Sequence, residues 1–224
     1  MSKIFPLGES ALTIEFSNEI SPEMNDKVIN LASYFEKNKF AGFVEVVPAY
    51  ASLTVFYEVF TVRKHFPEFQ TAFDGVKSFA ENAVCNFTEI KKEKSRVIEI
   101  PVRFNKEYAL DLKFVAEINN LKPRDVIEIF TAQSYRVYML GFLPGFAYLG
   151  EVDARIAAPR KFAPRLKVPK GSVGIAGRQT GIYPLASPGG WQIIGATEVE
   201  LFTPNAINPT FLQAGDLVKF YSEN

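Results

Sequence analysis

The chain has 224 residues, 25 basic and 25 acidic, and 47% of its residues are hydrophobic. This composition is ample for a folded core and excludes a disordered chain, and the zero net charge argues against a nucleic-acid-binding protein, which usually carries a basic excess. No apolar run approaches the roughly 20 residues that span a bilayer.

Two scarce residue types exclude several kinds of site. Cys85 is the single cysteine and His65 the single histidine, which excludes an internal disulfide and a Cys/His zinc cluster. His65 lies in a polar stretch before a proline and is predicted to be a surface loop residue, which argues against a Ser-His-Asp or Cys-His catalytic site. Neither a GxxxxGK[ST] phosphate loop nor a GxGxxG after a strand occurs. A single cysteine and no signal-peptide-like apolar run predict a cytoplasmic protein.

Hydrophobic spacing predicts an α/β organisation for the first part of the chain. Alternation of apolar and polar residues predicts a strand over 11–16. Ser21 and Pro22 predict a helix start, and apolar spacings of three and four continue that helix to about residue 38. The next predicted elements are strands over 43–47 and 52–59 and a helix over about 68–84. This order is most of a ferredoxin-like split βαβ unit, which one further strand would complete.

The polar, lysine-rich run KKEKSR at 91–96 predicts a boundary between a domain of residues 1–94 and a domain of residues 95–224. After it, alternation predicts a strand over 97–104, Asp111 is the expected N-cap of a helix, and Pro123 can open another. Short apolar runs between glycine and proline turns follow, and they predict strands of a barrel or sandwich: VGIAG, GIYPL, WQIIG, VELF and LVKFY.

The stretch from Gly141 to Gly195 contains ten of the fourteen glycines and six of the fourteen prolines. Such repeated use of residues with special backbone geometry predicts a shaped, loop-rich surface, where binding usually occurs. From Ala154 to Thr197 there are seven Arg or Lys residues and no Asp or Glu. These cations suit a small anion or an acidic partner surface; the alternative is a set of solvated loop cations.

The motif GFLPGF at 141–146 supplies the first candidate binding residues: Phe142, Pro144, Gly145 and Phe146. One interpretation is an apolar wall with free backbone N–H groups, suited to a planar or amide-bearing ligand. The other is a tight barrel corner with two core phenylalanines.

Cations that follow prolines are the second group, because proline stiffens the loop and arginine can grip a carboxylate or phosphate with two hydrogen bonds. Arg160 and Arg165 are the candidates of this kind. Amide, hydroxyl and indole groups that could contact a small polar molecule complete the set: Gln179, Thr180, Tyr183, Ser187 and Trp191. None of these is a strong general base at neutral pH, so the residues predict a binding surface for an anion or amide and not a reaction.

Three blocks of sequence resemble the family called allophanate hydrolase subunit 1, also known as the Kip kinase-inhibitor family or the B subunit of 5-oxoprolinase. They are RVYMLGFLPGFAYLG (136–150), PRKFAPRLKVPKGSVGIAGRQTGIYP (159–184) and SPGGWQIIGAT (187–197). The resemblance implies an α+β fold class: a small ferredoxin-like-type α/β N-terminal domain followed by a cyclophilin-like β-barrel domain of carboxyltransferase type.

The resemblance also implies partners and a reaction. Members form, with the C and A subunits of 5-oxoprolinase, an ATP-dependent enzyme that opens the lactam of 5-oxo-L-proline to L-glutamate. Related domains form the carboxyltransferase part of urea carboxylase, and another member inhibits a sporulation histidine kinase. ATP is therefore expected together with the partner subunits, and no metal or biotin is expected on this chain.

The chain departs from the family pattern in two places. Many members have His-Ser or His-Thr where this chain has Phe130-Thr131, and a Gly-containing turn is common where it has Tyr108-Ala109-Leu110. If that histidine transfers protons, this chain needs a residue from a partner; if it is structural, Phe130 fills the space.

The leading hypothesis is the B subunit of a 5-oxoprolinase, inactive alone, with Arg165 and neighbouring cations engaging a carboxylate or phosphate. The alternative is a non-enzymatic inhibitor of a sensor histidine kinase. A biotin-dependent carboxyltransferase component is disfavoured, because no biotin-attachment or carboxylase domain is found in this sequence.

Overall fold

The chain forms two compact units, Met1–Lys94 and Ser95–Asn224. The structure is a computed structural model that describes residues 2–17, 19, 21–86 and 95–223. Each unit contains a hydrophobic core of its own. In the described part of the chain, no helix combines the length and apolar composition needed to cross a membrane.

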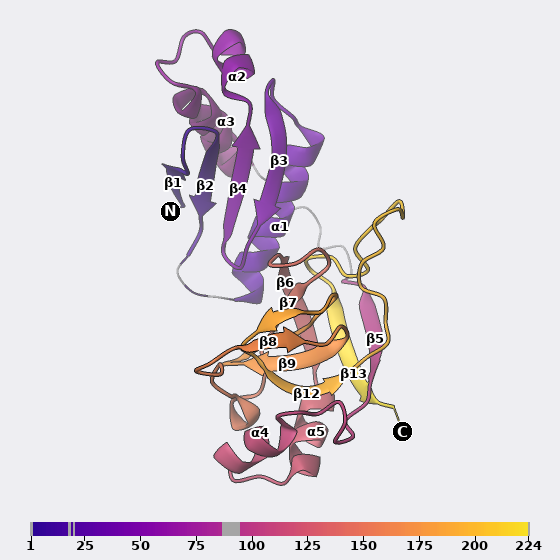
Figure 1. Ribbon diagram of the computed structural model, residues 1–224. Helices are drawn as coiled ribbons and strands as arrows, with labels where there is room; N and C mark the ends of the chain where they lie inside the picture. The colour runs from indigo at the N-terminus through magenta and orange to yellow at the C-terminus, as the bar shows by residue number, and fades with distance from the viewer. Residues whose placement is uncertain (1, 18, 20, 87–94, 224) are drawn as a thin grey trace. The chain divides into compact units, whose positions relative to one another are not determined.

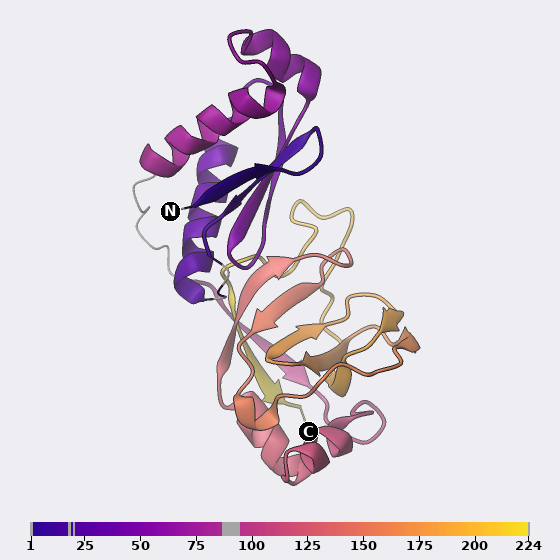
Figure 2. The same ribbon diagram turned by 90° about the vertical axis from the view of Figure 1, so that its left-hand side faces the viewer.

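The N-terminal unit is a four-stranded antiparallel sheet with helices on one face (Figures 1 and 2). The strand order is β1-β2-β4-β3. The elements in chain order are β1 (Lys3–Pro6), β2 (Ala11–Glu15), α1 (Pro22–Lys37), β3 (Phe43–Pro48), β4 (Ser52–Tyr57), α2 (Val59–His65) and α3 (Ala72–Asn86).

Helix α1 begins where the sequence predicts it. The Ser21 hydroxyl accepts a hydrogen bond from the Met24 N–H at 3.2 Å, and proline occupies the first turn, where no donor is needed. Its apolar stripe, Val28, Leu31 and Phe35, is completely buried against the sheet and α3. The helix is therefore fixed both by its cap and by the burial of one face.

The edge of this sheet differs from the prediction. The fourth strand, β1, precedes β2 and pairs with it as an N-terminal hairpin, whereas the ferredoxin-like pattern places a strand after the second helix. The ferredoxin-like assignment therefore stays a prediction. The expected strand over 52–59 ends at Tyr57, and the unpredicted helix α2 follows it. His65 is the last residue of α2 and not a loop residue, although it is exposed as expected.

The C-terminal unit is a curled seven-stranded sheet that fits a cyclophilin-like fold, with a two-stranded sheet of β11 and β8 beside it (Figure 1). The seven strands run in the order β12-β9-β10-β7-β6-β13-β5. The elements in chain order are β5 (Val97–Val102), α4 (Leu112–Ile118), α5 (Pro123–Thr131), β6 (Ser134–Leu140), β7 (Ala147–Gly150), the 3-10 helix η1 (Ala154–Ile156), β8 (Arg165–Val168), β9 (Ser172–Ala176), β10 (Gln179–Ile182), β11 (Ser187–Gly189), β12 (Gln192–Ala196) and β13 (Leu217–Ser222).

The two edge strands of the curled sheet, β12 and β5, meet at one backbone bridge. Arg103 and Ala196 exchange both backbone hydrogen bonds, at 2.8 and 3.0 Å, and so join the end of β5 to the end of β12. Helices α4 and α5 lie together against the sheet, where α4 contacts β12 and α5 contacts β13 (Figures 1 and 2).

Phe130, in α5, belongs to the hydrophobic core of the C-terminal unit. It is fully buried, and its ring lies 5.0 Å from the ring of Tyr135 and 5.0 Å from that of Phe220. The Tyr135 hydroxyl donates a hydrogen bond to the Phe130 carbonyl at 2.8 Å. Phe130 therefore fills space in the core.

One predicted strand is wrong. The run VELF at 199–202 forms no strand; its last residue, Phe202, makes only an isolated bridge to Thr210. Leu201 is buried, so this run contributes an apolar side chain to the core without forming the backbone hydrogen bonds of a strand.

Candidate functional site

A cavity of about 310 Å³ opens among the loops of the C-terminal unit. Its lining combines aromatic rings, two cations and a glycine-rich turn, and we call it the aromatic cavity. The lining residues are Phe142, Phe146, Tyr148, Arg160, Lys161, Pro164, Tyr183, Pro188, Gly189, Gly190 and Trp191.

Phe146 is the centre of the aromatic wall. Its ring centroid lies 4.9 Å from that of Tyr148, 5.4 Å from that of Tyr183 and 5.5 Å from that of Trp191, in edge-to-face arrangements. Phe146 is buried, whereas Phe142, at 5.6 Å from it, is exposed at the rim. Edge-to-face rings hold one another in place, so the wall is rigid and offers ring faces to a flat ligand.

Arg160 is the accessible cation of this cavity. Its guanidinium lies 6.0 Å from the Trp191 ring, at the outer limit of a cation–π contact. The side chain is exposed, and no carboxylate of the described residues forms an ion pair with it. It can therefore bind an anion at the cavity with both of its forked N–H groups.

The other nearby cations are held by a buried carboxylate, Asp111. Its two oxygens accept hydrogen bonds from Arg165 at 2.7 and 2.8 Å, from Lys161 at 3.1 Å and from the Ile193 N–H at 2.7 Å. Only 5% of Asp111 is exposed. It stands at the start of α4 as predicted, but its side chain makes no capping hydrogen bond there. The local sequence pattern indicated the helix start but not the ion cluster.

The cluster keeps Asp111 ionised. Burial alone would raise the pKa of Asp111, but the hydrogen bonds from Arg165, the Ile193 N–H and Lys161 outweigh burial and leave that pKa below its ordinary value. The carboxylate therefore fixes two cations of residues 160–168, whereas Arg160 has no carboxylate partner among the described residues.

Tyr183 is a neutral phenol at this site. Burial raises its pKa, and a backbone hydrogen bond at Trp191 and the nearby Arg160 oppose that effect only in part. A phenol held neutral can donate a hydrogen bond but is a poor general base. The aromatic cavity therefore has binding groups and no evident base among its lining residues.

The structure brings five of the candidate residues together around this cavity: Phe142, Phe146, Arg160, Tyr183 and Trp191. It places the other six elsewhere. Pro144 and Gly145 belong to the same turn as Phe142 but do not line the cavity, and Gly145 is buried with a φ of 80°. Gln179 lies half-buried in β10.

The remaining three candidates have partners within the chain. The Thr180 hydroxyl donates to the Gly174 carbonyl at 2.9 Å, and the Ser187 hydroxyl donates to the Pro188 carbonyl at 3.2 Å. The guanidinium of Arg165, expected to engage a ligand anion, is taken up by Asp111. Strand register decides which side chains face inward, and the sequence alone did not resolve it.

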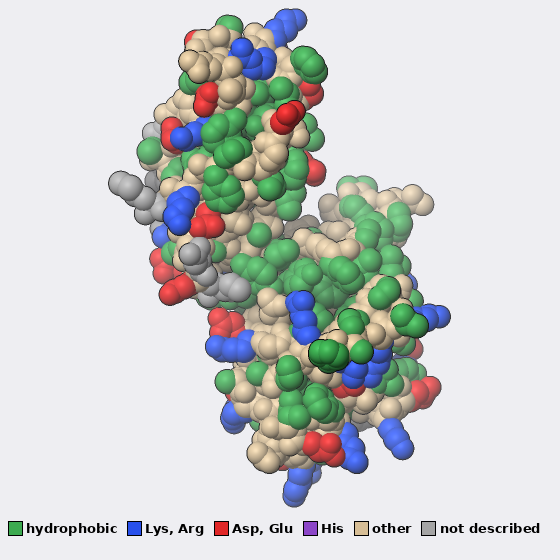
Figure 3. All heavy atoms as spheres, turned by 60° about the vertical axis from the view of Figure 1, so that its left-hand side comes forward, with side chains coloured by type: hydrophobic (Ala, Val, Ile, Leu, Met, Phe, Trp, Pro, Cys, Tyr) green, Lys and Arg blue, Asp and Glu red, His purple; other side chains and the backbone are tan. Residues whose placement is uncertain are grey.

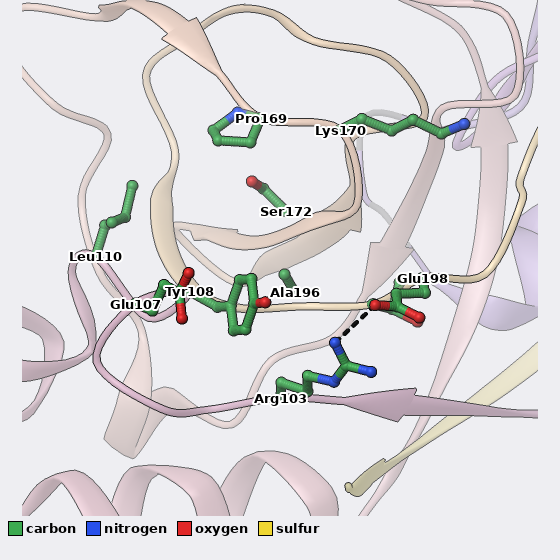
Figure 4. Close-up of a pocket in the computed structure, with 10 residues that line it drawn as sticks. Arg103, Glu107, Tyr108, Leu110, Pro169, Lys170, Ser172, Ala196 and Glu198 are labelled. Atoms are coloured by element: carbon green, nitrogen blue, oxygen red, sulfur yellow. Dashed lines mark hydrogen bonds and ion pairs between the residues drawn. The ribbon is translucent and has the colours of Figure 1, made fainter.

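A second cavity, of about 330 Å³, lies where the sheet edges meet (Figure 4). The guanidinium of Arg103, at the rim of this cavity, lies 2.6 Å from a carboxylate oxygen of Glu198 and 2.9 Å from one of Glu223. Its other cation, Lys170, is 2.6 Å from Glu200. The full lining is Arg103, Glu107, Tyr108, Leu110, Pro169, Lys170, Ser172, Ala196, Thr197 and Glu198. Because both cations already have carboxylate partners, the aromatic cavity is the better candidate for binding an anion.

The residue types around the aromatic cavity fit a small planar molecule that carries a carboxylate. Rings would contact its faces, and Arg160 would pair with the charge. No group of three or more His, Cys, Asp or Glu side chains able to hold a metal occurs among the described residues. The arrangement is suited to binding and orienting a ligand.

Known proteins resemble this chain along nearly its whole length. Residues 2–212 match the family model described as carboxyltransferase domain, subdomain C and D. A Bacillus subtilis protein named as the B subunit of 5-oxoprolinase is 49% identical over 219 residues, covering 97% of this chain and 91% of that protein. A Haemophilus influenzae protein of the same name is 39% identical over 98% of this chain and 97% of its own length.

A solved structure agrees with these sequence matches. The crystal structure of TTHA0988 is 32% identical with a TM-score of 0.80, and the match covers all of this chain but only 40% of that longer chain. The family match and the two full-length relatives together establish membership: the chain belongs to the carboxyltransferase domain, subdomain C and D, family.

Proposed function

We propose that the chain is the B subunit of an ATP-dependent 5-oxoprolinase, which hydrolyses 5-oxo-L-proline to L-glutamate together with the A and C subunits. The observation that carries this proposal is the shared name, the B subunit of 5-oxoprolinase, of relatives that are 49% and 39% identical over nearly the full length of the chain. A cytoplasmic location, expected from the sequence, belongs to the same proposal.

The aromatic cavity is the proposed contact surface for the substrate. 5-Oxoproline is a flat five-membered lactam with one carboxylate. Arg160 binds that carboxylate, because it is the cation of the cavity without a carboxylate partner among the described residues. Phe146 and Trp191 contact the ring, and the neutral hydroxyl of Tyr183 is a donor within reach of the cavity.

Catalysis is proposed to be shared between chains. The cavity lining offers no evident general base, and Lys161 and Arg165 are already held by Asp111. Among the described residues, the lining of this cavity has one cation without an ion-pair partner and no phosphate-binding loop, which is a poor fit for a nucleoside triphosphate. ATP is therefore assigned to the partner subunits, and this chain alone is expected to be inactive.

The proposed assembly has support from the longer chain of TTHA0988. The part that matches this chain makes up 40% of that polypeptide, so the same fold works there alongside further covalently attached sequence. This chain covers 91% and 97% of the Bacillus subtilis and Haemophilus influenzae relatives, each named as a single subunit, so we infer that a separate partner subunit supplies the corresponding remainder. The ferredoxin-like character of the N-terminal unit and the carboxyltransferase-type character of residues 95–224 are part of the proposal.

The names of the bacterial relatives favour this enzyme subunit over a histidine-kinase inhibitor. The deciding experiment is reconstitution. Glutamate release from 5-oxo-L-proline is measured with the A and C subunits in the presence and absence of this chain and of ATP. Release that requires both supports the proposal; release that does not depend on this chain refutes it.

A further inference from the structure

The loop and strand over residues 160–168, here called the docking segment, expose two large apolar side chains. Phe162 and Leu166 are both almost completely exposed. On the face that Figure 3 turns forward, hydrophobic side chains lie beside Lys and Arg side chains. Exposed apolar groups next to polar ones are typical of a protein–protein contact.

The apolar face of β8 continues beyond the core. Leu166 and Val168 point to the same face of the strand by alternation. Val168 is completely buried in the cluster with Phe146 and Trp191, whereas Leu166 is uncovered. In the described part of the chain, β8 pairs only with β11, so one of its edges can accept a further strand.

The charge of the docking segment favours an acidic partner. No Asp or Glu occurs between residues 154 and 197. Lys161 and Arg165 share the single negative charge of Asp111, so one positive charge of this pair stays uncompensated, and Lys167 has no ion-pair partner among the described residues. Lys167 adjoins the exposed Leu166, so a carboxylate on a partner would complement it.

The docking segment also borders the aromatic cavity, because Arg160, Lys161 and Pro164 line that cavity. We propose that the docking segment binds the C subunit. The bound part of the C subunit is an extended acidic segment with apolar side chains, which adds as a strand to the free edge of β8. A partner seated there lies at the mouth of the cavity and can supply the catalytic groups that its lining lacks. The inference rests on the proposed function, because its occupant is the partner subunit.

The test is binding of the full chain to the isolated C subunit, then to the preassembled pair of A and C subunits, measured by titration calorimetry. Phe162→Asp combined with Leu166→Asp should weaken binding about 30-fold or more, as expected for two central apolar contacts. Lys167→Glu should weaken it about tenfold and reduce its salt dependence. Ile207→Asp is the matched control, because Ile207 is equally exposed in the same unit but outside the docking segment, and it should bind like the wild type.

A second measurement does not depend on substitutions. Backbone amides of residues 165–168 should become protected from hydrogen exchange in the wild-type complex, because an added strand pairs with them. The docking proposal is overturned if the wild type binds, the Phe162→Asp, Leu166→Asp variant binds with the same affinity, and residues 165–168 gain no protection. That result leaves the proposed function intact. No binding of the wild type to either preparation refutes the proposed function, and the docking proposal with it.

Discussion

Asp111 connects three segments of the C-terminal unit through one carboxylate. It stands at the start of α4, its oxygens bind Lys161 and Arg165 in the docking segment, and it is bonded to the backbone of Ile193 in both directions. A buried carboxylate that accepts this many hydrogen bonds must stay ionised, because protonation would leave the cations without a counter-charge. We expect Asp111 to shape the aromatic cavity without contacting the substrate.

Asp111→Asn tests the stabilising role of this cluster. Loss of the charge should lower the free energy of unfolding by about 2 kcal/mol, a value reduced from that of a fully buried pair because the cations are partly exposed. Urea denaturation of the full chain measures the effect. The control is Glu117→Gln on the exposed face of α4, where the ion pair with Lys113 is 3.6 Å long and contributes about 0.5 kcal/mol or less. Equal losses in the two variants would contradict the account.

The same cluster makes stability depend on pH in the acid range. The pKa of Asp111 is lower in the folded chain than in the unfolded chain, so the ionised carboxylate adds to the free energy of unfolding. This added stability is complete above the ordinary Asp pKa of about 4 and is lost as the pH falls through the pKa that Asp111 has in the folded chain. Between neutral pH and about pH 3, the wild type should therefore lose more stability than Asp111→Asn does. Parallel acid-dependent slopes in the two proteins would show that Asp111 is not responsible.

Arg160→Ala tests the proposed carboxylate contact. With the A and C subunits in saturating excess, the KM for 5-oxo-L-proline should rise about 10- to 100-fold, because a charge-assisted pair contributes about 1.5–3 kcal/mol. Steady-state glutamate release measures this change. Arg124→Ala is the control, since Arg124 is exposed on α5 and, among the described residues, forms its ion pair with Glu128. An unchanged KM in Arg160→Ala would rule out Arg160 as the carboxylate-binding residue.

Among the elements, the turn between β8 and β9 depends on Gly171. Its φ is 80°, and a Cβ atom there would lie 2.1 Å from the Thr197 carbonyl oxygen. Gly177, between β9 and β10, has a φ of 60° but no atom within 4 Å of such a Cβ. The two glycines therefore share the left-handed backbone and differ in the space around them.

Alanine at each position separates these effects. Gly177→Ala should destabilise the chain by about 1 kcal/mol, the cost of a left-handed residue with a side chain. Gly171→Ala should destabilise it by about 2 kcal/mol more, because the backbone of Thr197 must also move. Thermal and urea unfolding provide the values. Equal destabilisation would mean that the close approach to Thr197 is not a constraint.

Local sequence signals predicted most of the helices and several strands. The start of α1 follows from Ser21 and Pro22, and the start of α5 from Pro123, because caps and first-turn prolines act within a few residues. The run VELF had the composition of a strand, yet the neighbouring backbone offers only the bridge between Phe202 and Thr210. Tertiary pairing overrides local preference in such runs.

The candidate site was predictable in its chemistry but less so in its geometry. Aromatic, basic and glycine-rich residues pointed to a binding surface, and five of them surround one cavity. The pairing of Asp111 with Arg165 joins residues 54 positions apart, so no local pattern could reveal it. It gives the Arg165 guanidinium a carboxylate partner within the chain.

At the scale of the whole molecule, each unit contains its own core, which predicts that residues 95–224 fold alone. The single tryptophan, Trp191, is buried in this unit and reports on its packing. The isolated fragment should show a blue-shifted tryptophan emission and a cooperative unfolding transition. A red-shifted emission with no cooperative transition would show that the fragment needs the N-terminal unit.

We propose this chain as one required part of an amide-ring hydrolase built from several different chains. The most direct measurement is the rate of L-glutamate release from 5-oxo-L-proline by the purified A and C subunits, with and without this chain and with and without ATP. Release is expected only when all three chains and ATP are present. Release by the A and C subunits alone at the same rate, or none from the complete set, would contradict it.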